Sequence, residues 1–211
     1  MGIALITSKM IAVFVGPGGM AYIGNFRNFM TSLEGISTLA FSSGVVKYVG
    51  ENEDKEKELT KIITTVLVTF LVFSTVLGFL IFVFSDFLCA KFFGNNLQYE
   101  IVFKVVAIVL PFSVVSVLFV SIINGLGSYS KLIYATIISN IIALVLTVLL
   151  IYEFKLVGAL LSTALNPTIL FTINFFYVHK DLQLLSRINL KQYDFSVLKK
   201  LAGFSIMILP S

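Results

Sequence analysis

The sequence contains little charge, one cysteine and one histidine. Only 12% of its 211 residues are charged, whereas 58% are hydrophobic, and the mean hydropathy is +1.00. A soluble domain of this size could not bury so much apolar surface. The single cysteine, Cys89, excludes an intrachain disulfide and a cysteine-based metal site, and a lone His179 is typical of a solvated side chain. The low charge content and the near absence of cysteine and histidine indicate a membrane protein rather than a soluble enzyme.

Motifs of catalysis are also absent from the sequence. It contains no P-loop, no cluster of histidine and cysteine, and no pair of carboxylates suited to catalysis. We therefore predict a protein that is not an enzyme, with no catalytic residue, no metal ligand and no cofactor. The N-terminus lacks the basic segment and cleavage site of a signal peptide. The net charge of +4 requires no nucleic-acid partner, because cytoplasmic loops of membrane proteins are commonly basic.

Long apolar runs divide the chain into membrane spans. Residues 62–84 and 132–151 each exceed the roughly 18 apolar residues that mark a transmembrane helix. The sequence predicts an all-α membrane protein in which six spans form one lobe of a transporter and a seventh span begins. The six segments are residues 1–15, 24–47, 62–84, 101–123, 132–151 and 157–178, with a GPGG turn at 16–19 and a loop at 85–100.

Three regions follow from this division. We expect a six-helix lobe over residues 1–178, a cytoplasmic amphipathic linker over 179–200, and the start of a truncated seventh span over 201–211. The connections after the second, fourth and sixth spans carry ten Lys and Arg residues, and those on the other side carry three. Because basic loops stay in the cytoplasm, this bias places the N-terminus inside the cell.

The second segment, residues 24–47, has two distinct faces on a helical wheel. Phe26, Met30 and Leu33 lie on an apolar half, whereas Asn28 and Thr31 lie on a polar half. We predict a membrane-spanning helix whose polar face lines a cavity or pathway. A helix lying on the membrane surface is the alternative, but such helices usually carry several Lys or Arg residues.

Three charged residues, Lys9, Arg27 and Glu34, lie inside predicted spans. Arg27 and Glu34 are two helical turns apart, about 10 Å along the axis, and a guanidinium suits phosphate or carboxylate oxygens. Two alternatives remain open: Arg27 can extend to the outer interface, and Lys9 can neutralise Glu34. Asparagines within spans serve either as ligands or as hydrogen bonds between helices. The predicted substrate-binding residues are Lys9, Asn25, Arg27, Asn28, Thr31, Ser32, Glu34, Asn140 and Asn166.

Four stretches carry a resemblance to a known family. They are KMIAVFVGPGG at 9–19, IGNFRNF at 23–29, SGVVKYV at 43–49 and NGLGSYSK at 124–131. With the spacing of the spans, they make the chain resemble the polysaccharide-transporter branch of the MATE-like (MOP) exporter superfamily. That branch includes the O-antigen and lipid III flippases, the Wzx group. Asn25 and Arg27 stand where the family pattern more often has glutamines.

The resemblance implies two lobes of six helices around a central cleft, of which this chain covers the first lobe and the start of the seventh helix. The implied activity moves an undecaprenyl-pyrophosphate-linked oligosaccharide from the cytoplasmic to the periplasmic leaflet of the bacterial inner membrane, by alternating access. Surface polysaccharide such as O-antigen would be the product, and the bilayer and assembly proteins such as a polysaccharide polymerase the expected partners. Arg27 and Lys9 would supply positive charge, and Asn25, Asn28, Thr31 and Ser32 would bind sugar or phosphate.

Three other functions compete with this interpretation. A cation-coupled multidrug exporter of the same fold would use Glu34 as its proton or sodium carboxylate. A glycan polymerase or ligase generally needs a large outer loop, and the predicted outer loops are short. A purely structural helix bundle would not need charged residues in its second span.

Overall fold

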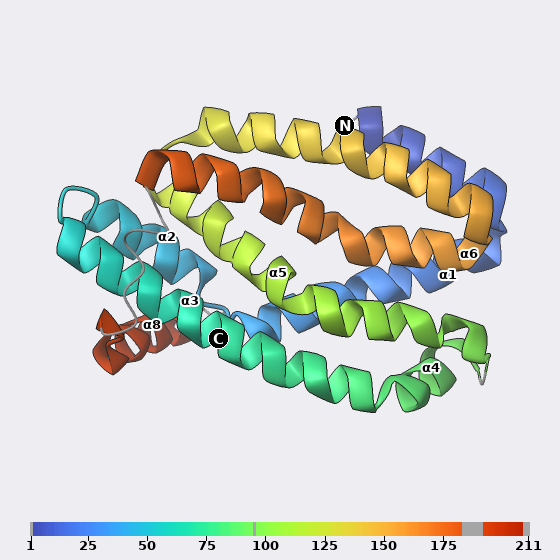
Figure 1. The fold of residues 1–211 in the computed structure, drawn as a ribbon, viewed down its shortest axis with the longest axis horizontal. Coiled ribbons are helices and arrows are strands. Elements are labelled where there is room, and N and C mark those ends of the chain that lie inside the picture. Colours follow the sequence, from blue (N-terminus) through green and yellow to red (C-terminus); the bar gives the residue numbers. More distant parts are fainter. Residues whose placement is uncertain (1, 95, 183–191, 209–211) are drawn as a thin grey trace.

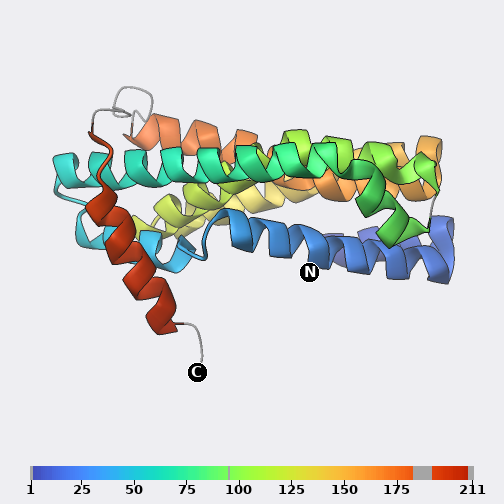
Figure 2. The same cartoon turned by 90° about the horizontal axis from the view of Figure 1, so that it is seen from below.

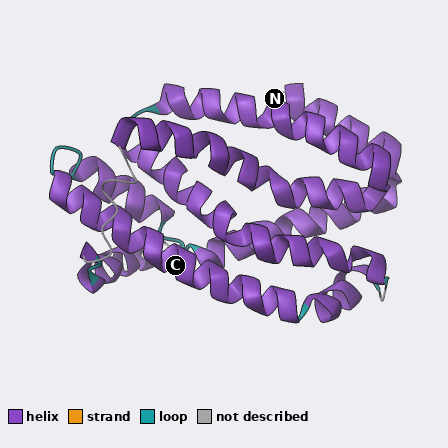
Figure 3. Cartoon of the chain, in the orientation of Figure 1, coloured by secondary structure: helices purple, strands orange, loops and turns teal. Residues whose placement is uncertain are grey.

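The protein is described here by a computed structural model covering residues 2–94, 96–182 and 192–208. Throughout these ranges the regular structure is helical, without a strand (Figure 3). Three of the described helices are long and apolar enough to cross a membrane: Glu56–Val83, Leu97–Gly125 and Tyr129–Lys180. The prediction of an all-α membrane protein is therefore confirmed.

Helix α1, Gly2–Ser37, consists of two arms joined at Gly16. Gly16 has φ 76° and ψ 176°, a conformation that glycine adopts without a steric penalty. Pro17 follows as the first residue of the second arm, where its missing N–H leaves no hydrogen bond unmade. Only one residue of the predicted GPGG turn thus leaves the helix, and the second arm runs back beside the bundle (Figure 1).

The predicted continuous helix over residues 24–47 is wrong at its centre. Helix α1 ends at Ser37 and α2 occupies Ser42–Glu51, while Leu39 (φ 51°) and Ala40 (φ 54°) between them are left-handed. The carbonyls of Glu34 and Gly35 accept backbone hydrogen bonds from the N–H groups of Thr38 (2.9 Å) and Ala40 (3.2 Å), and the Thr38 hydroxyl lies within hydrogen-bond distance of the same two carbonyls (2.8 and 3.2 Å). The break therefore divides the second span into two helices.

Helix α5, Glu100–Gly125, is the central helix of the bundle. It packs against α3 (Glu56–Val83), against α2, and against α6, and it retains helical structure through Pro111. Before it come α4, Ser85–Phe93, and the short 3₁₀ helix η1, Leu97–Tyr99. Residues 85–100, predicted as a loop, thus contain two helical elements.

Helix α6, Tyr129–Leu182, contains the fifth and sixth predicted spans as two arms. The chain reverses at Lys155, with φ 50° and ψ −121°, and the second arm returns alongside the first (Figure 1). A side chain at Gly158 would collide with the Leu150 carbonyl, so this reversal requires a residue without a Cβ. At about 1.5 Å per residue, a 52-residue apolar helix would be far too long for a single crossing.

Helix α8, Phe195–Ile208, leaves the bundle at an angle (Figure 2). Its N-terminus is capped by Asp194, whose carboxylate accepts a 2.8 Å hydrogen bond from the Ser196 backbone N–H. Asp194 also lies 3.4 Å from the Lys61 ammonium, and its backbone N–H donates to the Thr65 hydroxyl at 3.1 Å. Within the predicted linker, residues 179–182 continue α6, residues 183–191 lie outside the described ranges, and residues 195–200 begin α8.

The two ends of the bundle differ in how many basic residues they carry. One end gathers the Gly16 turn, α4, η1 and the Lys155 reversal (Figure 1). A cavity of about 600 Å³ lies there, lined by residues 14–15, 98–99, 101 and 153–157. The other end gathers α2, the start of α3 and the α5–α6 connection (Figure 1). The elements named at the second end carry five basic residues: Lys47, Lys55, Lys57, Lys61 and Lys131. The cytoplasmic placement of this end and of the N-terminus stays a prediction.

Candidate functional site

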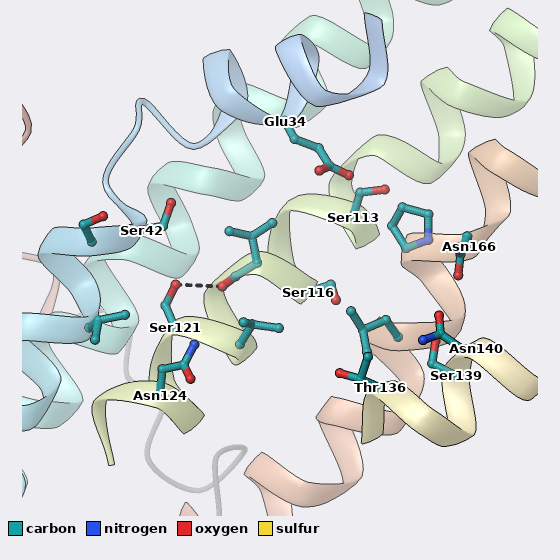
Figure 4. Close-up of a pocket in the computed structure, with 16 residues that line it drawn as sticks. Glu34, Ser42, Ser113, Ser116, Ser121, Asn124, Thr136, Ser139, Asn140 and Asn166 are labelled. Carbon is teal, nitrogen blue, oxygen red and sulfur yellow. Dashed lines mark hydrogen bonds between the residues drawn. The ribbon is translucent and has the colours of Figure 1, made fainter. Parts of the chain in front are cut away.

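A cavity of about 420 Å³ opens where the helix break meets α5 and both arms of α6 (Figure 4). This volume lies in the usual range of small-molecule sites. The wall is built from the end of α1, the start of α2, the second half of α5 and both α6 arms. Its lining residues are Glu34, Ser42, Ser43, Val46, Ser113, Ser116, Val117, Val120, Ser121, Asn124, Thr136, Ser139, Asn140, Asn166, Pro167 and Leu170.

The polar side chains of this lining are almost all neutral. Ten are hydroxyl or amide groups, one is the carboxylate of Glu34, and none of the lining residues is Lys, Arg or His. Hydroxyl and amide groups match the donors and acceptors of a sugar. A phosphate or pyrophosphate would find no cation in this wall. The cavity is therefore suited to a neutral polyol more than to an anion.

Three of the lining hydroxyls have their protons occupied by their own helices. Ser113 donates to the Val109 carbonyl (3.3 Å), Ser121 to Val117 (2.9 Å) and Thr136 to Leu132 (2.8 Å). A hydroxyl whose proton is already used in a hydrogen bond can act toward a ligand only as an acceptor. The buried Ser116 hydroxyl has no partner. The cavity wall thus offers several acceptors for ligand O–H groups, together with serine hydroxyls whose protons are free to donate.

Glu34 contributes the single charge of the cavity. Its side chain is half-buried and points toward Ser113 on α5 (Figure 4). In the described part of the chain no Lys or Arg forms an ion pair with it, and Lys9 lies exposed on the first arm of α1. The alternative in which Lys9 neutralises Glu34 is therefore not observed.

The second arm of α1 packs through its apolar face and presents its polar face outward. Phe26 is fully buried, and its ring meets Phe103 of α5 edge to face at 6.2 Å. Phe29 contacts Phe92 of α4 and Phe103 in the same manner, at 5.1 and 5.8 Å. These aromatic contacts fix the rotation of the arm. Five predicted site residues consequently lie exposed on the opposite face: Asn25, Arg27, Asn28, Thr31 and Ser32.

The exposed polar face continues into the cavity along one edge of α1. Arg27, Thr31 and Glu34 are spaced i, i+4 and i+7, so they lie along the same edge of the helix. The Thr31 hydroxyl donates to the Arg27 carbonyl at 3.0 Å, and Ser32 donates to Asn28 at 2.9 Å. No ion pair with Arg27 occurs among the described residues. Arg27, Thr31 and Glu34 thus form a polar edge of α1 that runs from the exposed guanidinium to the cavity.

The structure brings together only part of the predicted site. Glu34, Asn140 and Asn166 line the cavity, whereas Lys9 and the five exposed residues of the second arm lie outside it. Sequence reasoning missed the serines of α2 and α5 and the start of α6. The spacing of Ser113, Ser116 and Asn124 at i, i+3 and i+11 places them on one face of an apolar helix, and this signal could have identified them.

Comparison with known proteins identifies the family. Residues 27–211 match the family described as "Polysaccharide biosynthesis protein". The lipid III flippases of Escherichia coli (strain K12) and Shigella flexneri are each 30% identical to this chain over 109 residues. The match covers 52% of this chain and 26% of each flippase, so it spans about a quarter of the relatives' length. No solved structure matches the chain.

The family match extends over most of the chain and includes the helix break, α5 and both arms of α6. It covers every element that lines the cavity, and it agrees with the resemblance carried by the sequence motifs. This chain therefore belongs to the polysaccharide biosynthesis protein family.

Proposed function

We propose that this chain forms a lobe of a flippase that moves a lipid-linked oligosaccharide across the bacterial inner membrane. The observation that carries the proposal is the hydroxyl- and amide-lined cavity within a bundle of apolar helices. A cavity of this chemistry has no role toward lipid, because unpaired polar groups are costly in hydrocarbon. The family match and the similarity to lipid III flippases support the same activity.

The substrate would be a glycan on undecaprenyl pyrophosphate, delivered from the cytoplasmic to the periplasmic leaflet for O-antigen or a related polysaccharide. In this proposal the sugars enter the cavity, where Ser121 and Thr136 accept hydrogen bonds from their hydroxyls. The polyprenyl tail remains in the bilayer. The amides of Asn140 and Asn166 supply donors from the two arms of α6.

The pyrophosphate is assigned to the exposed face of α1. Arg27 lies two turns from Glu34, about 10 Å along the helix axis, which separates the anionic group from the carboxylate. Its guanidinium can bind phosphate oxygens in a bidentate manner. Asn25 and Asn28 flank it on the same exposed face, and Lys9 adds a second cation from the first arm.

Alternating access would require a second lobe that rocks against this one. The broken second span fits such a mechanism, since transporters often place helix breaks at their substrate sites. Here the break at residues 38–41 lies directly between Glu34 and the cavity serines of α2. Polysaccharide polymerase and other assembly proteins are the partners expected to receive the product.

The test removes Arg27, the residue proposed to bind phosphate, and compares the effect with the removal of a cation remote from the cavity. Arg27→Ala, alone and with Lys9→Ala, is expected to reduce surface glycan strongly in cells that depend on this protein. Lys57→Ala, an exposed residue at the other end, serves as the matched control and should leave glycan levels unchanged. Wild-type glycan in the double variant, at equal protein levels, would refute the cationic site.

A cation-coupled exporter of small hydrophobic drugs is the second candidate. The specific observation in its favour is the solitary carboxylate of Glu34 in the cavity. Glu34→Gln would then abolish drug efflux and leave surface glycan normal. The flippase proposal predicts instead that drug resistance does not depend on the protein.

A further inference from the structure

The charge balance of the cavity bears on which sugars it can accept. Its wall contains one carboxylate and ten neutral polar groups, with no basic residue among those that line it. The carboxylate, on Glu34, points toward Ser113 at one edge of the cavity (Figure 4). Any negatively charged ligand group entering this cavity would therefore meet an uncompensated like charge.

Among the described residues, no cation of the second span forms an ion pair with this charge. Arg27 is about 10 Å from Glu34 along the helix axis and lies on the exposed face, outside the lining. No ion pair joins Glu34 to a basic residue in the described ranges. At an effective dielectric constant of about 20, two like charges about 8 Å apart repel by about 2 kcal/mol, or about thirtyfold in a rate or an affinity, and screening by salt reduces this to the order of tenfold.

Three hydroxyl groups of the wall cannot donate a hydrogen bond to an anion. Ser113, Ser121 and Thr136 donate their protons to carbonyls of their own helices, at 2.8 to 3.3 Å. Each can then only accept a hydrogen bond, as an ionised carboxylate also can. A neutral sugar hydroxyl can donate to these three groups, whereas a uronic-acid carboxylate cannot. The other serines and the asparagine amides of the wall can donate to either ligand, so the charge of Glu34 carries the selection.

We propose that this cavity selects neutral or amino sugars and rejects acidic ones, with Glu34 as the residue that sets this specificity. The inference rests on the proposed flippase function and adds the substrate class of the same site. The pyrophosphate remains outside the cavity near Arg27, so the selection acts on the sugars alone. Glycans with a uronic acid among the sugars that enter the cavity would be poor substrates.

The experiment compares two substrates that differ at one carbon. The protein is placed in lipid vesicles with a short polyprenyl-pyrophosphate trisaccharide containing either glucose or glucuronic acid at the same position. Movement is measured as protection of the sugar from an added glycosidase, and the readout is the ratio of the two rates. The wild type is expected to move the neutral glycan on the order of tenfold faster.

Variants then assign the selection to the cavity. Glu34→Gln is expected to bring the ratio close to one, whatever its effect on the individual rates. Asn166→Asp adds a second carboxylate to the wall and is expected to widen the ratio. Glu58→Gln, on an exposed residue at the start of α3, is the matched control and should keep the wild-type ratio.

The outcomes separate the inference from the function on which it rests. Equal movement of both glycans by the wild type, or an unchanged ratio in Glu34→Gln, would overturn the specificity. If Glu34→Gln does not fold, an unchanged ratio in Asn166→Asp overturns it equally. Failure to move either glycan in the wild type would instead refute the flippase proposal itself.

Discussion

Gly78 lies where α3 and α5 approach each other at backbone distance. A Cβ added to this glycine would lie 2.6 Å from the Ala107 carbonyl oxygen, which a side-chain rotation cannot relieve. Gly24 on α1 has open space where its Cβ would be. Gly78 is therefore needed for the close packing of α3 against α5. At Gly24 no contact requires a glycine, so there glycine only lowers helix stability.

We expect Gly78→Ala to lower the free energy of unfolding by about 1–3 kcal/mol, as overpacked cores do. Gly24→Ala should raise it by about 0.5–1 kcal/mol, because alanine loses less conformational entropy in a helix. Thermal unfolding of both variants in detergent micelles measures the difference. Equal stability of the two variants would contradict the close contact of α3 with α5.

Residue-scale prediction from the sequence succeeded where it depended on helical periodicity. The apolar face of the second arm of α1 is buried at Phe26, Met30 and Leu33, as its spacing predicts, although Ile36 is 58% exposed. It failed for the cavity serines, since hydroxyls at those positions bind their own helix as readily as a ligand. Which of them face a shared space depends on how five helical segments pack.

At the scale of elements, the break at residues 38–41 is the feature that the sequence conceals. Leu39 and Ala40 are left-handed, yet neither is glycine or asparagine, the residues that usually mark this conformation. The surrounding pattern keeps its helical period through the break. Local propensity therefore favours one helix, and packing of α2 against α5 overrides it.

A glycine at the break should relieve backbone strain. Left-handed backbone costs a non-glycine residue about 1–2 kcal/mol, and glycine in the unfolded chain costs about 0.5–1 kcal/mol. We expect Ala40→Gly to raise the free energy of unfolding by up to about 1 kcal/mol. Ala21→Gly, in the exposed helical part of α1, should lower it by about 1 kcal/mol. Destabilisation by both variants, measured in micelles, would show that Ala40 is not left-handed.

The attachment of α8 depends on the ionised form of Asp194. Hydrogen bonds from Ser196, and then the nearby Lys61 ammonium, hold the pKa of this carboxyl below its usual range. Because the pKa is lowered in the folded state, the contribution of this group is present above the unfolded pKa of about 4 and is lost as the pH falls through the folded pKa.

We therefore expect hydrogen exchange of the α8 amides, corrected for intrinsic rates, to be constant above about pH 5 and faster below about pH 4. Asp194→Ala should accelerate exchange at neutral pH more than Asp194→Asn, since asparagine still caps the helix. If the alanine and asparagine variants exchange equally fast, the cap contributes nothing to the attachment.

At the scale of the whole molecule, the apolar spans in α3, in α5 and in the two arms of α6 could be predicted, because membrane helices satisfy their own backbone and so depend little on distant contacts. The reversals at Gly16 and Lys155 fall at the turns that the sequence predicts. The α4–η1 segment could not be predicted, because its apolar residues join the packing of α1 and α5 instead of forming a span. The position of α8 likewise depends on contacts between its residues and α2, such as the 6.3 Å approach of Phe204 to Tyr48.

The arrangement of the ends gives a test of orientation for the whole lobe. Single cysteines at Asn52 and Gly127, at the basic end, should react with a membrane-impermeant maleimide only after the cells are opened. Cysteines at Asn96 and Glu153, at the opposite end, should react in intact cells. All four positions are at least partly exposed, and Cys89 is buried, so the unmodified chain provides a weakly labelled background. Labelling of Asn52 in intact cells would reverse the orientation, whereas labelling of Asn52 and Gly127 from opposite sides would contradict the fold itself.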